Sequence, residues 1–274
     1  MDWTEKYRPK IFDDIVGQEK IVNYYKSYKE RCEWNEKERD YIDEIFKREN
    51  DYNIANNSHL EIANLILDYP KYFSDDILEK AQDMSGKPKP PHAIFRGRCG
   101  IGKTTTAKVI ENEFNLAKPM TINGSQDRSL TYFREKVIPT MKVAPFSGNF
   151  RLIVVDEIES MLKEAWMVLK TPLENYQENV MVIFICNDDK GIPEAIYSRC
   201  KTWDFTPISR EDIVSRLRYI ADNEQVDVTD DVLKTISEKA KNDLRKAINL
   251  FEDYSKKALQ FGKDEFSDMF VLTG

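Results

Sequence analysis

Eight residues, Gly97 to Thr104, constrain the fold of this chain more than any other stretch. They read Gly-Arg-Cys-Gly-Ile-Gly-Lys-Thr, which is the G-x-x-x-x-G-K-T pattern of a phosphate-binding loop. A short apolar run at 92–95 precedes the loop, and residues 105–110 read as the first turns of a helix. A strand, a glycine-rich loop and a helix in this order predict an α/β fold that holds a nucleoside triphosphate.

Each part of the loop has a role that follows from its chemistry. The glycines let backbone N–H groups turn towards an anion, and the helix N-terminus adds the positive end of its dipole. We expect Lys103 to reach the β- and γ-phosphates and the Thr104 hydroxyl to ligate Mg²⁺. The residues expected to line the phosphates are Gly97, Arg98, Cys99, Gly100, Ile101, Gly102, Lys103, Thr104 and Thr105.

Length and composition limit the class of protein. A chain of 274 residues can hold two domains with a sizeable core. It has no apolar run of the ~18 residues that a membrane span needs, and no signal peptide. Four scattered cysteines lack metal or disulfide spacing, which favours a reducing compartment: the cytoplasm, or the nucleus in a eukaryote. The net charge of −7 argues against a generally basic nucleic-acid binder but allows a local basic track.

Two further apolar runs end in polar residues that suit phosphate chemistry. Residues 151–155 lead into Asp156 and Glu157, and residues 180–186 lead into Asn187. Such runs are typical of buried parallel strands, whose carboxyl ends carry ligands in open α/β sheets. We expect Asp156 to hold Mg²⁺, Glu157 to activate a water, and Asn187 to sense the γ-phosphate or position that water. The alternatives are ordinary solvated acids and an Asn that caps a turn.

Prolines mark the expected ends of helices and strands. Pro9 disfavours helix at the preceding residue, so the N-terminus is expected to begin extended and to become helical near Gln18. Pro172 is expected to end or kink the preceding helix, which is expected to hold Met161, Leu162, Ala165, Trp166 and Leu169. From Pro207 onwards the pattern is purely helical, with three capped helices that predict a small separate domain.

The stretch 31–83 has a different composition. It holds 14 acidic and 7 basic residues, an excess equal to the net charge of the whole chain. Apolar residues recur with helical spacing, and Tyr41, Ile45 and Phe46 are expected to share one face. Two or three acidic helices are therefore expected, followed by a linker at 85–91. They are either a solvated insertion with a packing role or a docking module for a partner.

Read together, these motifs resemble the clamp-loader branch of the AAA+ ATPases, and within it most closely the replication factor C small subunits. The resemblance covers residues 1–28 and 85–274. The matching motifs are Trp3 to Pro9, Asp14 to Gln18, Asn123 to Ser125, the phosphate loop, Asp156-Glu157, Cys186-Asn187, Ser198-Arg199-Cys200 and Asp243 to Asn249.

The resemblance implies a fold and its division into domains. Residues 1–206 would form the AAA+ P-loop domain, an α/β fold with a central parallel sheet flanked by helices, with the helical insertion at 31–83. Residues 207–258 would form a three-helix lid. Residues 259–274 would begin a helical collar, which either is missing from this sequence or is absent from the protein.

The resemblance also implies residue roles. Adenine would lie among Tyr7, Arg8, Pro9, Ile15 and Val16. Arg245 would contact the nucleotide of its own subunit, whereas Arg199 would act in trans and complete the site of a neighbour. The catalytic groups would be Glu157, Lys103, Asn187 and, in trans, Arg199, and Mg²⁺ would lie on Thr104 and Asp156.

The implied function is that of a DNA sliding-clamp loader subunit. ATP and Mg²⁺ would bind between subunits of a homo- or hetero-oligomeric pentamer that opens a sliding clamp and loads it on primer–template DNA. Arg128, Arg134 and Lys136 are candidates for DNA phosphate contacts, with a solvated helix face as the alternative. Two other functions stay open: an AAA+ remodeller of protein partners, and a structural subunit that binds ATP.

The sequence departs from this family at three places. The first is the acidic insertion at 31–83. The second is Lys170-Thr171-Pro172, where replication factor C small subunits usually carry two arginines and where the chain is closer to the bacterial DNA polymerase III clamp-loader motor subunit. The third is Cys99, which stands where clamp loaders more often have proline and is either a tolerated small residue or a reactive thiol.

Overall fold

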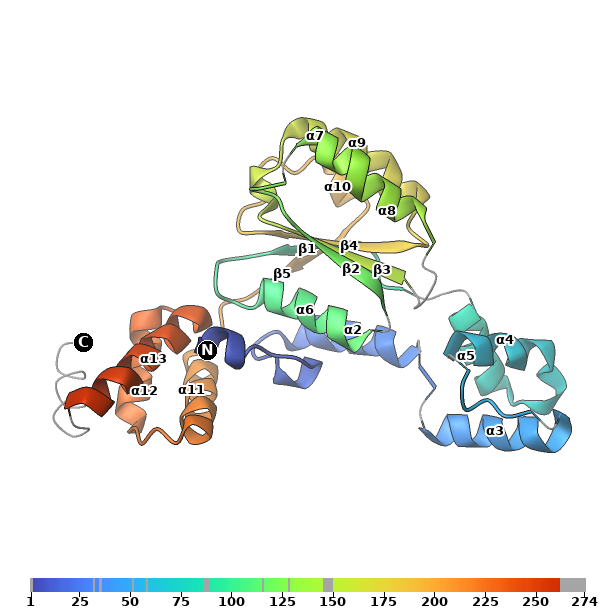
Figure 1. Cartoon of the computed structure of the whole chain (residues 1–274), viewed down its shortest axis with the longest axis horizontal. Coiled ribbons are helices and arrows are strands. Elements are labelled where there is room, and N and C mark those ends of the chain that lie inside the picture. The colour runs from blue at the N-terminus through green and yellow to red at the C-terminus, as the bar shows by residue number, and fades with distance from the viewer. Residues whose placement is uncertain are drawn as a thin grey trace.

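A parallel five-stranded sheet forms the centre of the computed structural model (Figure 1). The structure describes residues 2–31, 33–34, 36–50, 52–57, 59–85, 89–114, 116–127, 129–144 and 150–261. The strands are β1 Ala93–Arg96, β2 Leu116–Asn123, β3 Phe150–Asp156, β4 Val180–Cys186 and β5 Lys201–Asp204, in the spatial order β2-β3-β4-β1-β5. The α/β fold class predicted from the sequence is confirmed.

Every residue of β4 is buried, because helices cover both faces of the sheet. Alternate side chains of a strand point to opposite faces, and the two cores follow that alternation. Ile183 and Ile185 pack in one core with α2 (Glu19–Arg31) and α6 (Lys103–Glu113). Val182 and Phe184 pack in the other, where α9 (Lys163–Asn175) and the segment 130–142 lie. Figure 1 shows these two helical layers on either side of the sheet.

The segment 130–142 is one continuous helical run of three kinds. It begins as α7 (Leu130–Tyr132), widens to a π-helix over Phe133–Val137, and ends as α8 (Ile138–Lys142). Phe133 and Val137 are buried against the sheet, whereas residues 134–136 between them are exposed. The wider turn therefore directs a short charged stretch towards solvent.

Two expectations about local structure were wrong. Residues Trp3–Lys6 form a short helix, α1, capped by Asp2, because Pro9 constrains only Arg8. Helix α9 continues through Pro172 to Asn175, since the proline lies in the last turn, where few helical bonds follow, and its ring is buried.

The strand β5 was not predicted from the sequence. It is a short edge strand in which only Trp203 is buried, so it lacks the apolar run that marks the other strands. A short helix, α10 (Glu194–Tyr197), follows Pro193.

The three C-terminal helices form a bundle with its own core. They are α11 (Arg210–Glu224), α12 (Asp230–Ala240) and α13 (Leu244–Phe261). Ser209 caps α11 by accepting a hydrogen bond from Asp212 N at 3.0 Å. The N-terminal helix α1 packs on this bundle, where the rings of Trp3 and Phe251 lie 5.3 Å apart. We call the bundle the lid.

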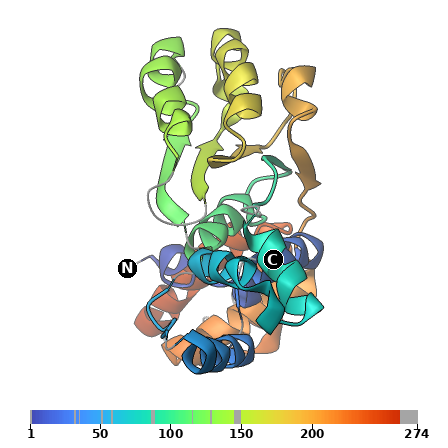
Figure 2. The ribbon, with the colours of Figure 1, turned by 90° about the vertical axis from the view of Figure 1, so that its right-hand side faces the viewer.

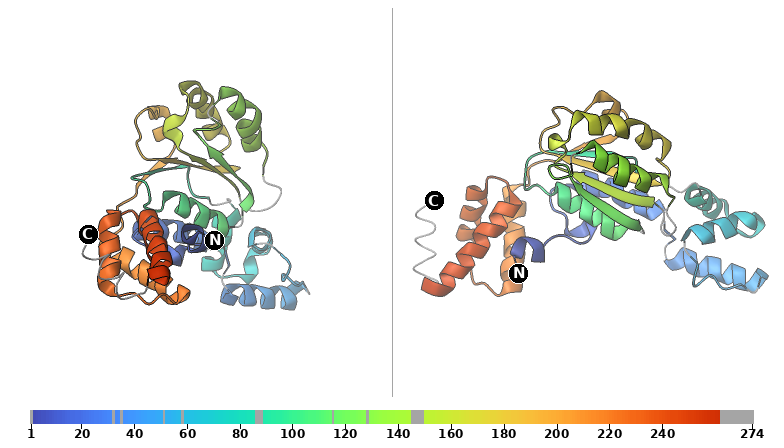
Figure 3. Two further views of the ribbon diagram at one scale, coloured as in Figure 1. Left: turned by 60° about the vertical axis from the view of Figure 1, so that its left-hand side comes forward. Right: turned by 45° about the horizontal axis from the view of Figure 1, so that its top comes forward.

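The acidic stretch forms a separate unit of helices α3 (Glu36–Asn50), α4 (His59–Asp68) and α5 (Asp75–Ser85). Its buried side chains belong to a core of their own, and on α3 the buried residue is Ile42 rather than the expected Tyr41, which is 43% exposed. The sequence offers Asn57-Ser58 as a cap for the helix that follows, but Ser58 lies outside the described residues. Figure 2 shows the helices in front of α2, and Figures 1 and 3 place them opposite the lid. We call this unit the acidic module.

No helix within the described ranges is long and apolar enough to cross a membrane.

Candidate nucleotide site

The phosphate loop joins β1 to α6 and lies against the start of α13. Gly100 has a φ of +75°, and a Cβ there would lie 1.9 Å from the carboxylate of Asp243. The Leu244 amide donates to Gly100 O at 3.2 Å. A side chain at this position would be strained by the positive φ and would displace the Asp243 carboxylate, so glycine suits the contact between loop and lid.

Lys103 is buried at the base of the loop, with 7% of its surface exposed. Its ammonium donates to Gly97 O at 2.7 Å, to Arg98 O at 2.6 Å and to Asn187 Oδ1 at 3.0 Å. These contacts occupy all three donors of the ammonium. Burial lowers the pKa of Lys103. A phosphate would supply a negative partner for a charge that now lies among neutral oxygens.

Thr104 and Asp156 bring two oxygen ligands together. The Thr104 hydroxyl donates to Asp156 Oδ2 at 2.8 Å. Mg²⁺ prefers oxygen ligands and is usually held by one or two protein groups together with substrate phosphates. The pair fits Mg²⁺ on that basis. No cluster of three or more His, Cys, Asp or Glu that could cage a metal occurs in the part of the chain described.

Glu157 stands next to this pair in a left-handed conformation, with φ 55° and ψ 43°. A non-glycine residue in that region is strained, and such strain is concentrated at functional sites. The neighbouring turn accommodates it: a Cβ on Gly124 would lie 2.8 Å from Glu157 O and 3.0 Å from Asp156 O. Only a glycine at 124 permits this close approach.

Asn187 is held from two sides. Its side-chain oxygen accepts from Lys103, and its Nδ2 donates to Glu159 Oε1 at 3.0 Å. The amide orientation is therefore fixed by a donor on one side and an acceptor on the other. Glu159 was not identified from the sequence, because an exposed acid two residues after Glu157 carries no motif of its own.

Most of the predicted site residues line one cavity of about 190 Å³. Those it brings together are Tyr7, Arg8, Pro9, Ile15, Val16, Cys99, Gly100, Ile101, Gly102, Lys103, Thr104, Thr105, Asp156, Glu157, Asn187 and Arg245. Gly97 and Arg98 do not line the cavity, but their carbonyl oxygens accept hydrogen bonds from Lys103. Their assignment to ATP stays a prediction.

The cavity wall also contains residues that sequence reasoning missed. They are Thr4, Asp14, Ile208, Arg216, Leu244 and Ile248. Leu244 and Ile248 stand four residues apart on α13, so helical periodicity could have placed them on the face of Arg245. Arg216 lies on α11 and donates to Tyr7 O at 2.7 Å. No motif marks that arginine, because the contact joins residues 209 positions apart.

Arg199 lies away from this cavity, on a second surface hollow formed with Leu173, Glu174, Gln177 and Ser198. It donates to Glu174 Oε2 and to Ala195 O, both at 2.7 Å. Arg134 and Lys136 are exposed on the π-helix, and Arg128 lies outside the described residues. Arg199, Arg134 and Lys136 therefore do not line the nucleotide cavity of their own chain.

Two family models match the chain. The model "ATPase family associated with various cellular activities (AAA)" matches residues 93–207, which hold all five strands. The model "RCF1/5-like, AAA+ ATPase lid domain" matches residues 215–255 in the lid.

These two matches identify an AAA domain and an AAA+ lid in one chain.

Replication factor C small subunits are among the relatives of this chain. The chain is 34% identical over 255 residues to the "Replication factor C small subunit 2" of Pyrobaculum islandicum, covering 91% of this chain and 62% of that protein. It is 30% identical over 254 residues to the "Replication factor C small subunit" of Methanothermobacter thermautotrophicus, again covering 91% and 62%. The chain thus spans about 62% of the length of these relatives, and the resemblance inferred from motifs is confirmed.

A solved structure shares the fold of this chain. The Holliday junction branch migration motor RuvB of Thermotoga maritima superposes with a TM-score of 0.65 at 16% identity, over 97% of this chain and 71% of that one. At this identity the likeness concerns the fold alone.

Proposed function

We propose that the chain is an ATPase subunit of a DNA sliding-clamp loader. The observation that carries the proposal is the cavity in which the phosphate loop, Asp156, Glu157 and Asn187 meet Arg245 of the lid. The groups that line this cavity come from both the sheet and the lid. We therefore expect the lid to close on the sheet domain when nucleotide binds. The relatives named replication factor C small subunit support the choice of clamp loading over other AAA+ activities.

The proposed chemistry is electrostatic positioning. Lys103 and the loop amides bind the phosphates, and Thr104 with Asp156 would hold Mg²⁺, which supplies positive charge to the phosphate oxygens when it is bound. Glu157 orients the attacking water and accepts its proton. Asn187, held by Glu159, contacts the γ-phosphate end of the site.

Arg199 is proposed to serve a neighbouring subunit. Its hollow is separate from the cavity of its own chain, and its guanidinium is held at that surface by Glu174 and Ala195 O. An arginine supplied in trans stabilises charge in the transition state of phosphoryl transfer. Hydrolysis would then require assembly with other subunits, consistent with a pentamer that acts on a sliding clamp and primer–template DNA.

The proposal also divides the chain into domains. Separate cores support an AAA+ domain at 1–206, the acidic module at about 31–83 within it, and a lid at 207–258. Most of the expected collar start, residues 262–274, lies outside the described residues.

The test is Glu157→Gln in the assembled protein. Loss of the carboxylate should lower ATP turnover by about 100-fold or more, because a general base contributes that much, while ATP affinity stays close to that of the wild type. Steady-state turnover with and without clamp and primed DNA, together with equilibrium binding of a fluorescent ATP analogue, measures both. Unchanged turnover at saturating ATP would contradict the role of Glu157. ATP turnover that is the same with and without clamp and primed DNA would contradict clamp loading.

A further inference from the structure

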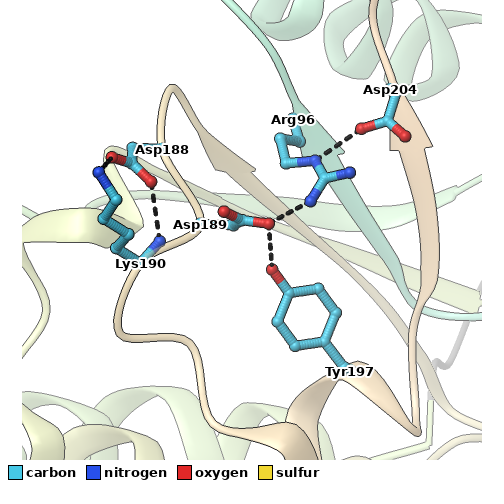
Figure 4. A network of polar contacts seen from close by, with 6 residues as sticks. All are labelled: Arg96, Asp188, Asp189, Lys190, Tyr197 and Asp204. Atoms are coloured by element: carbon cyan, nitrogen blue, oxygen red, sulfur yellow. Dashed lines mark hydrogen bonds and ion pairs between the residues drawn. The ribbon is translucent and has the colours of Figure 1, made fainter.

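Arg96, the last residue of β1, is the centre of a polar network that joins three elements (Figure 4). Its Nε donates to Asp204 Oδ1 at 2.6 Å, at the end of β5, and its Nη1 donates to Asp189 Oδ2. Tyr197, the last residue of α10, donates its hydroxyl to the same Asp189 oxygen at 2.8 Å. One carboxylate on the loop after β4 therefore bonds both to β1 and to α10.

Three members of this network are one or two positions from a group of the proposed machinery. Arg96 directly precedes Gly97, the first residue of the phosphate loop. Asp189 lies two residues after Asn187, whose side-chain oxygen accepts a hydrogen bond from Lys103. Tyr197 precedes Arg199 by two residues. The network thus spans the chain between the nucleotide cavity and the hollow of Arg199.

Helix α10 depends on such anchors. It has four residues, and a single helical turn has little stability of its own. Ile196 anchors it in the core, and the Tyr197 hydroxyl anchors it to the loop after β4. The contacts of Arg199 itself, with Ala195 and Glu174, lie on α10 and α9 and do not reach the phosphate loop.

The charges of the network keep it in place at neutral pH. Arg96 and then Tyr197 lower the pKa of Asp189, so the carboxylate stays ionised. Burial and the bond to Asp189 raise the pKa of Tyr197, so the hydroxyl keeps its proton. Arg96 is 36% exposed, so these pairs add little to stability, and their consequence is geometric.

We propose that Arg96, Asp189 and Tyr197 are positioning residues that set how Arg199 is presented to the neighbouring subunit. Movement of the Asn187 loop when nucleotide binds would pass through Asp189 to α10. The nucleotide state of one subunit would thereby act on hydrolysis at the next. The inference rests on the proposed trans role of Arg199.

The test uses mixed assemblies in which the effect in trans is isolated. Subunits carrying Glu157→Gln do not turn over ATP themselves but still present Arg199 to wild-type neighbours. Adding Tyr197→Phe or Asp189→Asn to them should lower turnover by the wild-type subunits about tenfold, less than the ~100-fold that a 1 Å misplacement can cost. Affinity of the variant subunit for a fluorescent ATP analogue should not change.

Asp188→Asn is the matched control, one residue away. Asp188 pairs with Lys190 and lies apart from Arg96 in Figure 4, so this change should leave the neighbours' turnover unchanged. In an Asp189→Ala background, Tyr197→Phe should add little, because either change removes the hydrogen bond between the Tyr197 hydroxyl and residue 189. Thermal unfolding of each variant checks folding, and Tyr197→Phe, which keeps the ring, remains decisive if Asp189→Asn unfolds.

Arg199→Ala, added to the Glu157→Gln subunits, distinguishes the positioning role of the network from the trans role of Arg199. If it silences the neighbours while Tyr197→Phe does not, the positioning role is overturned and the proposed function stands. If Arg199→Ala leaves the neighbours at full turnover, the trans role itself fails. Equal losses from Asp188→Asn and Asp189→Asn, or a loss confined to the variant's own nucleotide affinity, overturn the positioning role.

Discussion

Strained and crowded backbone marks the end of β3, at Asp156 and Glu157. Glu157 adopts a left-handed conformation, and its carbonyl oxygen lies against Gly124, whose amide donates to Asp156 O at 2.7 Å. The turn after β2 therefore supports the turn that carries both acids. This support is specific to glycine, because a methyl group at 124 would collide with two backbone oxygens, which cannot rotate away.

Gly124→Ala should therefore damage the site by displacing the Asp156–Glu157 turn. We expect a loss of about 1–3 kcal/mol in the free energy of unfolding, together with reduced turnover. Urea unfolding and steady-state ATPase rates measure the two effects. Ser125→Ala, at the exposed next position, is the control and should stay near wild type in both. A fully active, stable Gly124→Ala protein would show that the turn has room to relax.

At the scale of secondary-structure elements, His92 connects the start of β1 to α9 and β4. It is buried just before β1, where its Nε2 lies 2.9 Å from Leu173 O at the end of α9, and its Nδ1 accepts from Val182 N of β4 at 3.0 Å. These bonds suit the neutral ring with its proton on Nε2. Burial lowers the pKa of His92 from 6.5 to about 4.

The shifted pKa predicts the direction of a pH effect. Because folding lowers the pKa, the unfolded chain takes up the proton first, so stability falls as pH drops from 6.5 towards 4. Between pH 6.5 and 5 the wild type should lose about 2 kcal/mol more than His92→Gln, which keeps a donor and an acceptor without titrating. Urea unfolding at both pH values measures this. Parallel losses in the two proteins would contradict it.

At the scale of the whole molecule, the acidic module and the lid lie at opposite ends of the AAA+ domain (Figures 1 and 3). The module has its own core and closes on itself, since Trp34 donates from its amide to His59 Nδ1 at 2.9 Å and from its ring to His59 O at 3.1 Å. The lid, in contrast, contacts the phosphate loop directly through Gly100 and Asp243. The module thus stands apart from the nucleotide site, whereas the lid forms part of it.

Replacing residues 32–85 by a flexible Gly/Ser linker should leave the nucleotide site working. Distant sites without shared partners act independently, so ATP affinity and basal turnover should stay within about twofold of the wild type. Fluorescent nucleotide binding and thermal unfolding of the shortened chain test this. Failure to fold would show that the module supports α2 and α6. A selective loss of stimulation by clamp or DNA would favour the docking role.

A second prediction at this scale concerns DNA. Arg134 and Lys136 are both exposed on the π-helix, between the buried anchors Phe133 and Val137. If they contact phosphates, each substitution by Ala should reduce the slope of log affinity against log salt by about 1. Titration of primed DNA into the assembly at several salt concentrations measures that slope. An unchanged slope in these variants would contradict the phosphate contact and favour a solvated helix face. Lys142→Ala, on α8, is the control and should leave the slope as in the wild type.

Local chemistry determined much of this protein from the sequence alone. The phosphate loop, the acids after β3 and the amide after β4 were found because each follows a buried apolar strand, and chain order then predicts one sheet edge. The helical character of the lid and the acidic module followed from apolar spacing. These features depend on neighbours within a few residues, which is the range over which sequence patterns are informative.

The tertiary structure decided what depends on contacts between distant residues. Gly124 beside Glu157, Glu159 on Asn187, Arg216 on Tyr7 and Arg96 between Asp189 and Asp204 join positions between 28 and 209 residues apart. The same holds for the short strand β5, which is defined by pairing with β1 rather than by its own apolar content. Side-chain type alone cannot specify such partners, because only the folded chain brings them within hydrogen-bonding distance.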